Sequence, residues 1–350
     1  MSAREGIMKP RWQKLRAPLL VAVVLTLALV AIRLATNPPR QSLWTVLPAE
    51  ADIYFFADLD ALQSNPAVKW FMNNGPAIPG GLSKNADIDN ETAEFERATG
   101  FRYQDHLHEL TAARLNDNWT GVVRFTADRV KLEQYLESHA ASTAKKDFTK
   151  VYTFGGASPL RIAFLANDLL TFSIGSDATV LDRTMDRYRN GGGTNGDIPN
   201  SEQGLPPDAL VDEAHRKILA RPLWAIGQAD RIFSVAQSDG RGPPLLGGFL
   251  LGEDTLAGVE QIFLSMDSGP LTLRVEAEIL SSKETVARPL AEKLTLLSKL
   301  MRPRPPVAGS GERDYSPVWD AVAVSVKDSS VFIRWSPTPE MLTLLSGTKP

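Results

Sequence analysis

An uncharged apolar stretch, residues 17–32, constrains the fold of this chain more than any other feature. A helix rises about 1.5 Å per residue and needs on the order of 20 apolar residues to cross a bilayer. Adding Arg33, Leu34 and Ala35 extends the stretch to that length, because an arginine at a helix end can reach the polar interface. The sequence therefore predicts a single transmembrane helix over residues 17–35.

The flanks of this helix predict its orientation. Residues 1–16 form a tail with five basic side chains and one acidic one. By the positive-inside rule this tail stays in the cytoplasm, and the rest of the chain is extracytoplasmic, anchored in the inner membrane. A cleaved signal peptide is the alternative, but the segment Ile32-Arg33-Leu34-Ala35 lacks the small residues at alternate positions that cleavage requires. Cleavage of the anchor is left open.

The net charge and the absence of cysteine exclude some classes of function. The whole chain has a formal charge of −3 and the tail carries +4, so residues 17–350 carry −7. An acidic exported body does not fit a nucleic-acid-binding protein, which needs a basic surface. The chain has no cysteine, which excludes disulfides, thiolate nucleophiles and cysteine metal sites.

The second half of the chain resembles the first. Residues 223–232 align without gaps on residues 53–62, each an apolar strand pattern followed by a helical one. The Gly-Pro segment at 242–249 likewise resembles the one at 75–82. Each half is predicted to run strand, helix, strand, helix, hairpin, helix, with one hairpin at Asn167-Asp168.

These patterns predict an α+β fold of two tandem related units, each with an antiparallel or mixed sheet packed against helices. The first unit spans residues 44–190, a Gly/Pro-rich linker spans 191–208, and the second unit spans 209–350. We expect the units to pack about a pseudo-twofold axis, with a functional surface in the groove between them. Pro289 interrupts the helix expected from residue 282, so a start near Arg288 is the alternative.

One short pattern resembles a known group of proteins. Leu47-Pro48, followed by the strand and Asp-Leu pattern of residues 54–59, resembles the opening of the ectodomain in bacterial membrane-anchored or exported proteins of unknown function. The resemblance covers about a dozen residues and implies no activity and no specific family.

Two sets of side chains are candidates for chemistry. Asp58 and Asp60 have the spacing of a two-carboxylate metal motif, but only Asp60 has a counterpart in the repeat, Asp230. We therefore interpret Asp60 as a helix N-cap. His106 and His108 form the only histidine pair and lack further ligands at zinc spacing, so we interpret them as solvated helix surface.

No nucleophile elbow or phosphate-binding loop is present, so the sequence predicts no catalytic residue, metal site or cofactor. The repeated Gly-Pro segments are the remaining candidates, because apolar residues on loops can mark a contact with a partner, lipid or ligand. A fold element lying over the sheet is the alternative. The residues of this candidate contact loop are Leu245, Leu246, Phe249, Leu250, Leu251, Ile78 and Leu82.

We expect a single-pass, membrane-anchored extracytoplasmic (periplasmic) protein that acts as a non-catalytic binding or scaffold module of the cell envelope, with an envelope protein as its partner. One alternative is the binding of an apolar small molecule or lipid in the cleft between the repeats. Another is a hydrolase whose carboxylates lie far apart in the sequence. A closed apolar pocket, convergent buried carboxylates or an open apolar patch would distinguish the three.

Overall fold

The computed structural model describes residues 43–66, 68–69, 86–156, 158–192, 211–212, 215–232, 257–269, 272–302, 314 and 316–341. The predicted transmembrane helix lies outside these residues. No helix among the described residues is long and apolar enough to span a bilayer.

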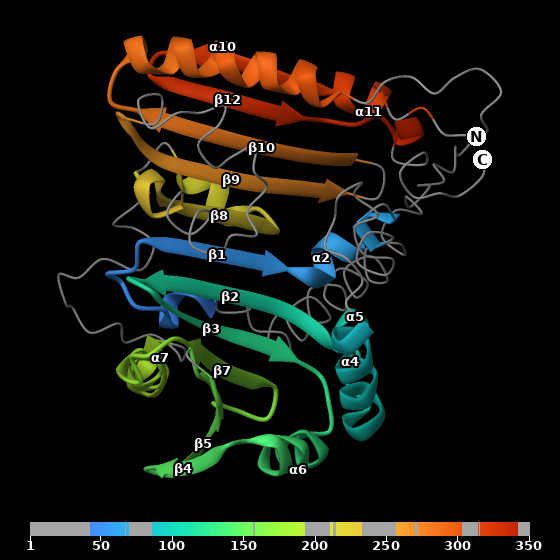
Figure 1. The fold of residues 1–350 in the computed structure, drawn as a ribbon, viewed down its shortest axis with the longest axis vertical. Helices are drawn as coiled ribbons and strands as arrows, with labels where there is room; N and C mark the ends of the chain where they lie inside the picture. The colour runs from blue at the N-terminus through green and yellow to red at the C-terminus, as the bar shows by residue number, and fades with distance from the viewer. Residues whose placement is uncertain are drawn as a thin grey trace, which may run out of the picture. The chain divides into compact units, whose positions relative to one another are not determined.

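The fold is α+β, as predicted, and the described residues form one antiparallel sheet of twelve strands (Figure 1). The strands in the first half of the chain are β1 (Ile53–Asp58), β2 (Leu107–Leu115), β3 (Asn118–Phe125), β4 (Ser142–Lys146), β5 (Thr149–Phe154), β6 (Leu160–Phe164) and β7 (Leu169–Ile174). Those in the second half are β8 (Leu223–Gln228), β9 (Val259–Gly269), β10 (Thr272–Ser281), β11 (Val322–Lys327) and β12 (Ser330–Trp335).

Helices lie against this sheet and at its ends (Figure 1). The α-helices are α2 (Leu59–Gln63), α4 (Ala86–Thr99), α5 (Tyr103–His106), α6 (Arg129–His139), α7 (Thr179–Arg187), α10 (Glu284–Met301) and α11 (Ser316–Asp320). Shorter helical segments are η1 (Leu43–Val46), η2 (Tyr188–Gly192) and η3 (Arg216–Ala220).

The strand order is the same in both halves when counted from the middle of the sheet. It runs β1-β2-β3-β7-β6 in one direction and β8-β9-β10-β12-β11 in the other, and β5 and β4 extend only the first half. A helix, α6 or α10, follows the third strand of each half, and a hairpin follows the helix. The two halves therefore share one topology.

Strand pairing joins the two halves. β1 and β8 are antiparallel neighbours, and Phe55 lies opposite Ala225 in the middle of both strands. These two residues are also aligned with each other in the gapless match of residues 53–62 with 223–232. The pairing thus has a local twofold axis that relates equivalent positions of the two halves.

A shared core covers this joint. Tyr54 of β1 and Trp224 of β8 are fully buried in one cluster with Leu47 and with Phe263 of β9. Phe56 stacks on Trp224 with ring centroids 5.6 Å apart, and the Tyr54 hydroxyl donates to the Pro48 carbonyl at 2.7 Å. Aromatic side chains of this size dominate core energetics, so the joint is a packed interior.

Several sequence-based boundaries need correction. The loop between β6 and β7 has four residues, not two, whereas two-residue turns at Asn116, Asp147 and Asp328 close other hairpins. Each of these three residues has a positive φ of 53–55°, which Asn and Asp adopt more readily than other residues with side chains. The helix α10 begins at Glu284 and contains Pro289, so the alternative start near Arg288 is wrong.

Candidate functional site: the α10–β11 groove

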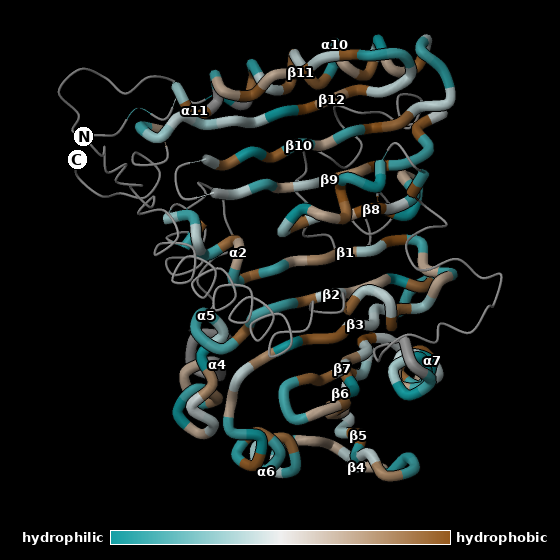
Figure 2. Tube along the Cα trace, turned by 180° about the vertical axis from the view of Figure 1, so that it is seen from behind, coloured by the Kyte–Doolittle hydropathy of each residue, from teal (hydrophilic) through white to brown (hydrophobic). Residues whose placement is uncertain are grey.

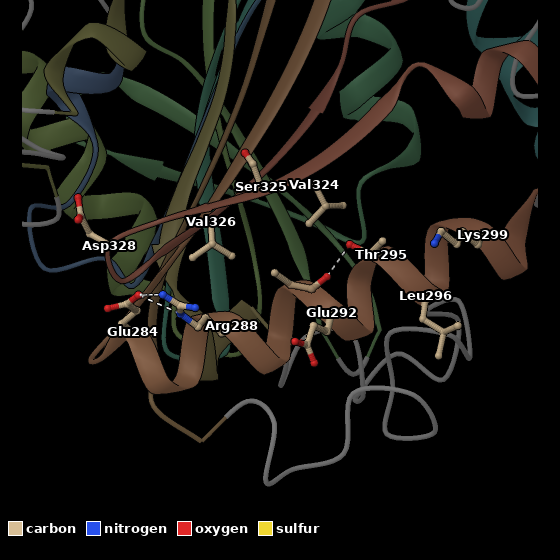
Figure 3. Close-up of a pocket in the computed structure, with 11 residues that line it drawn as sticks. Glu284, Arg288, Glu292, Thr295, Leu296, Lys299, Val324, Ser325, Val326 and Asp328 are labelled. Carbon is tan, nitrogen blue, oxygen red and sulfur yellow. Dashed lines mark hydrogen bonds and ion pairs between the residues drawn. The ribbon is translucent and has the colours of Figure 1, made fainter.

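The described part of the chain contains an open groove of about 590 Å³ between α10 and β11, which we call the α10–β11 groove (Figure 3). β11 is the last strand at one end of the sheet. The groove therefore lies along a sheet edge. Its lining residues are Glu284, Arg288, Ala291, Glu292, Thr295, Leu296, Lys299, Val324, Ser325, Val326 and Asp328.

The amphipathic pattern of α10 creates the helical wall of the groove. Its inner stripe, which includes Ala287, Leu290 and Leu297, is buried against Ile279 of β10 and Val331 of β12. The groove residues of α10 recur three or four positions apart, from residue 284 to residue 299. They therefore share one face of the helix, beside the buried inner stripe. Along α10 in Figure 2, hydrophilic and hydrophobic residues alternate, as in an amphipathic helix.

Charge is distributed unevenly along the groove. Glu284 accepts a hydrogen bond from Arg288 Nε at 2.9 Å, an exposed pair that adds little to stability. Glu292, Lys299 and Asp328 have no ion pair within the described ranges. Asp328 and Glu284 lie at one end of the groove and Lys299 lies at the other (Figure 3). Because Arg288 pairs with Glu284, the charges without an ion pair in the described ranges make the first end acidic, at Asp328, and the other end basic, at Lys299.

Exposed apolar side chains accompany these charges. Leu296 on the groove wall is 55% exposed, and Leu300, four residues further along the same side of α10, is 65% exposed. Val326 of β11 is also exposed. Large apolar groups that remain open to solvent beside an unpaired strand edge are typical of a contact surface.

The candidate contact loop predicted from the sequence is not tested. All seven residues of this loop lie outside the described residues. The α10–β11 groove contains none of them. Nothing in the composition of residues 284–328 distinguishes it, but a second helical stripe on α10 and the alternating valines of residues 322–326 were signals that could have indicated it.

The aspartate pair is positioned differently from our expectation. Asp58, not Asp60, is the N-cap of α2, and its carboxylate accepts a hydrogen bond from the Ala61 backbone N–H at 3.0 Å. Asp60 lies in the first turn and contacts His108 Nδ1 through Oδ1 at 2.8 Å. The interpretation of Asp60 as the cap is wrong because α2 begins at Leu59, directly after β1, whereas a cap at Asp60 would require the helix to begin at residue 61.

The histidine pair does not lie on one helix surface. His106 ends α5, whereas His108 lies on β2, where its Nε2 contacts the Thr126 hydroxyl at 2.7 Å. Asp60, His108 and Thr126 thus form a chain of hydrogen bonds that links α2, β2 and the segment after β3. Within the described residues no cluster of three or more His, Asp or Glu side chains could hold a metal ion.

A further histidine, which the sequence did not single out, is held by two carboxylates. His215 contacts Asp212 at 2.5 Å and Glu278 at 3.2 Å, and its ring stacks on Phe263 at 4.2 Å. Burial lowers the pKa of His215, but the hydrogen bonds to Asp212 and Glu278 and their negative charges outweigh it and raise the pKa above its usual value. This cluster ties the segment before β8 to the sheet.

A buried carboxylate holds the start of the described chain. Burial raises the pKa of Glu109 on β2, although the Leu43 backbone N–H and the Arg124 guanidinium both donate to it, at 3.3 and 3.4 Å, and oppose the rise. Because these donors occupy the carboxylate, Glu109 serves as a structural tie between η1 and the sheet.

No model of a known protein family matches this chain, and no curated protein matches it either. Among solved structures, crystal form I of TP0453 gives a TM-score of 0.46 at 11% identity over 87% of this chain and 96% of that chain. Crystal form IV gives 0.45 at 10% identity with the same coverage, and form III gives 0.43 at 9% identity over 87% and 98%. A similarity at this level supports no inference about this chain.

Proposed function

We propose that this protein is a single-pass, membrane-anchored extracytoplasmic binding module of the cell envelope, and that the α10–β11 groove is its binding surface. The observation that supports this proposal is a strand edge to which no further strand pairs in the described part of the chain, with exposed apolar side chains beside it, Leu296, Leu300 and Val326. An open edge offers backbone N–H and C=O groups to another strand, and side chains at its flank provide specificity.

The membrane anchor is a proposal as well, and the apolar sequence of residues 17–35 and the basic tail before it support it. We further infer that the two halves are related repeats. Their common strand order and the central pairing of Phe55 with Ala225 support a duplication. The packed joint between the halves gives less support to lipid binding in a cleft there.

Site-specific cross-linking in intact cells tests the binding surface. A photoreactive amino acid at Leu300 or Val326, in the groove region, should yield cross-linked species in the membrane fraction. The matched control is Phe148, a large apolar residue that is 95% exposed in the turn between β4 and β5. Equal capture from all three positions, or none from the groove with the protein confirmed in the membrane, would contradict the proposal.

A further inference from the structure

We propose that the occupant of the α10–β11 groove is a second copy of this chain, bound by antiparallel pairing of the two β11 strands about a twofold axis. This inference rests on the proposed function and names its partner. In such a dimer the two sheets become one continuous sheet, and each copy contributes the same surface to the interface.

The two edges of the sheet differ in how they meet solvent. β4, at one edge, carries Lys145 and Lys146, and charged lysines are a common means of preventing edge-to-edge pairing. β11, at the other edge, alternates Val322, Val324 and Val326 with small side chains and has one lysine, at its end. β-Branched residues favour strand pairing, so β11 is the edge suited to it.

The charges along the groove of one chain are complementary to those along the groove of a second chain. Antiparallel pairing places the beginning of one β11 beside the end of the other. The basic end of one groove, at Lys299, then approaches the acidic end of its partner, at Asp328, while Glu292 lies between the two ends (Figure 3). Twofold symmetry produces this contact twice, and in each contact Lys299 and Asp328, which have no ion pair within the described ranges, obtain an opposite partner.

The same arrangement would bury the exposed apolar residues of α10. A twofold axis perpendicular to the sheet keeps both copies of α10 on the same face, side by side and antiparallel. Leu296 and Leu300 lie four residues apart, so they form one ridge on the helix. In the dimer this ridge would face the α10 of the other copy and leave solvent, which is favourable by about 25 cal/mol per Å² of apolar surface.

The fold already contains a joint of this kind. β1 and β8 connect the two halves by antiparallel pairing about a local twofold axis, and helices from both halves pack on the sheet that results. The proposed dimer repeats this geometry between chains.

Single cysteines test the arrangement without interference, because the chain has no cysteine of its own. In full-length protein in detergent, Val324→Cys or Ser325→Cys should form a covalent dimer with a short bismaleimide, because residues in the middle of β11 lie near the twofold axis. Phe148→Cys is the exposed control and should not form a covalent dimer, because residue 148 lies at the opposite edge of the sheet. Light scattering of the unmodified protein should give the mass of two chains.

A charge exchange tests the register. Lys299→Glu should weaken the dimer by about tenfold, about 1.4 kcal/mol, by placing like charges opposite each other. Adding Asp328→Lys in the same chain should restore it, which also excludes misfolding as the cause. A loss that this second substitution does not restore would contradict the register.

These experiments distinguish a failure of the second-copy proposal from a failure of the proposed function. If the protein is monomeric and the β11 cysteines do not cross-link, while photo-cross-linking from the groove captures a different protein, the second-copy proposal is overturned and the proposed function stands. If the protein is monomeric and the groove captures nothing, both are overturned.

Discussion

At the scale of single residues, two aspartates only two positions apart have different roles. Asp58 caps α2, and Asp60 holds His108. An N-cap side chain that is replaced by alanine costs about 1 kcal/mol, because a backbone N–H of the first turn loses its acceptor. We therefore expect Asp58→Ala to lower the free energy of unfolding by about 1 kcal/mol in a chemical denaturation experiment.

The control for this prediction is Asp58→Asn, since asparagine caps helices as well as aspartate does. Asn should keep most of the stability that Ala loses. An equal loss for both variants would show that the charge of Asp58, and not its role as an acceptor, matters.

His215 gives the fold a pH dependence. Its pKa in the folded protein is raised by Asp212 and Glu278, despite an opposing effect of burial, whereas the unfolded chain has the usual value of about 6.5. The protonated ring therefore stabilises the fold fully below pH of about 6.5, and this contribution is lost as the pH rises through the folded-state pKa.

Denaturation of wild type and His215→Gln across pH 5.5 to 8.5 measures this contribution directly. We expect the advantage of the wild type to be largest at the acidic end and to shrink toward the alkaline end. The variant Glu278→Gln should reduce the slope, because it removes one of the two carboxylates. An advantage that grows with pH would contradict the assignment.

At the scale of elements, β3 depends on a close approach at one glycine. A Cβ at Gly121 would lie 2.5 Å from the Thr111 carbonyl of β2 and 2.5 Å from the ring of Phe172 on β7. Because one of these neighbours is backbone, the strands would have to shift, and overpacking of this kind costs about 1–3 kcal/mol. We expect Gly121→Ala to lower the melting temperature markedly.

Gly155→Ala is the matched control, since a Cβ there meets only Ala141 at 3.8 Å, an ordinary contact. Its melting temperature should stay close to that of the wild type. Equal melting temperatures for the two variants would show that β3 accommodates a methyl group without strain.

Elements whose apolar residues recur with a clear helical or strand period were predictable from the sequence, and elements without such a period were not. Asp128 caps α6, and Leu132 and Leu136 of this helix are buried; here the capping residue and the apolar spacing in the sequence indicate the same helix. β2 was missed: it combines Glu109, Arg114 and alanines, which read as helix or loop, and becomes a central strand only through pairing on both sides. Tertiary context decided its conformation.

At the scale of the whole molecule, the α10–β11 groove could not be read from the sequence for a related reason. Its walls are α10 and β11, whose groove residues, 284–299 and 324–328, lie 25 to 44 positions apart in the chain. They meet because β11 pairs with β12 and β12 with β10, so that α10, which follows β10, lies across the edge. Strand order is a non-local property, and only the hairpin part of it was predictable.

The joint between β1 and β8 leads to a prediction about cooperativity. Because one sheet and one buried cluster, with Tyr54 and Trp224 at its centre, connect the two halves, destabilising one half should destabilise the other. Leu290 on α10 is buried in a cluster that contains only residues of the second half. Leu290→Ala should remove about 2–5 kcal/mol through lost burial and a residual cavity.

Native-state hydrogen exchange is the measurement. If the halves unfold as one unit, the most protected amides of β3, in the first half, lose as much protection in Leu290→Ala as those of β10 in the second. Leu132→Ala, beneath α6, is the converse test and should reduce the protection of β10 equally. Loss confined to the half that carries the substitution would instead mean that β1 and β8 separate before either half unfolds. The two repeats would then be independent folding units that the central strand pair merely connects.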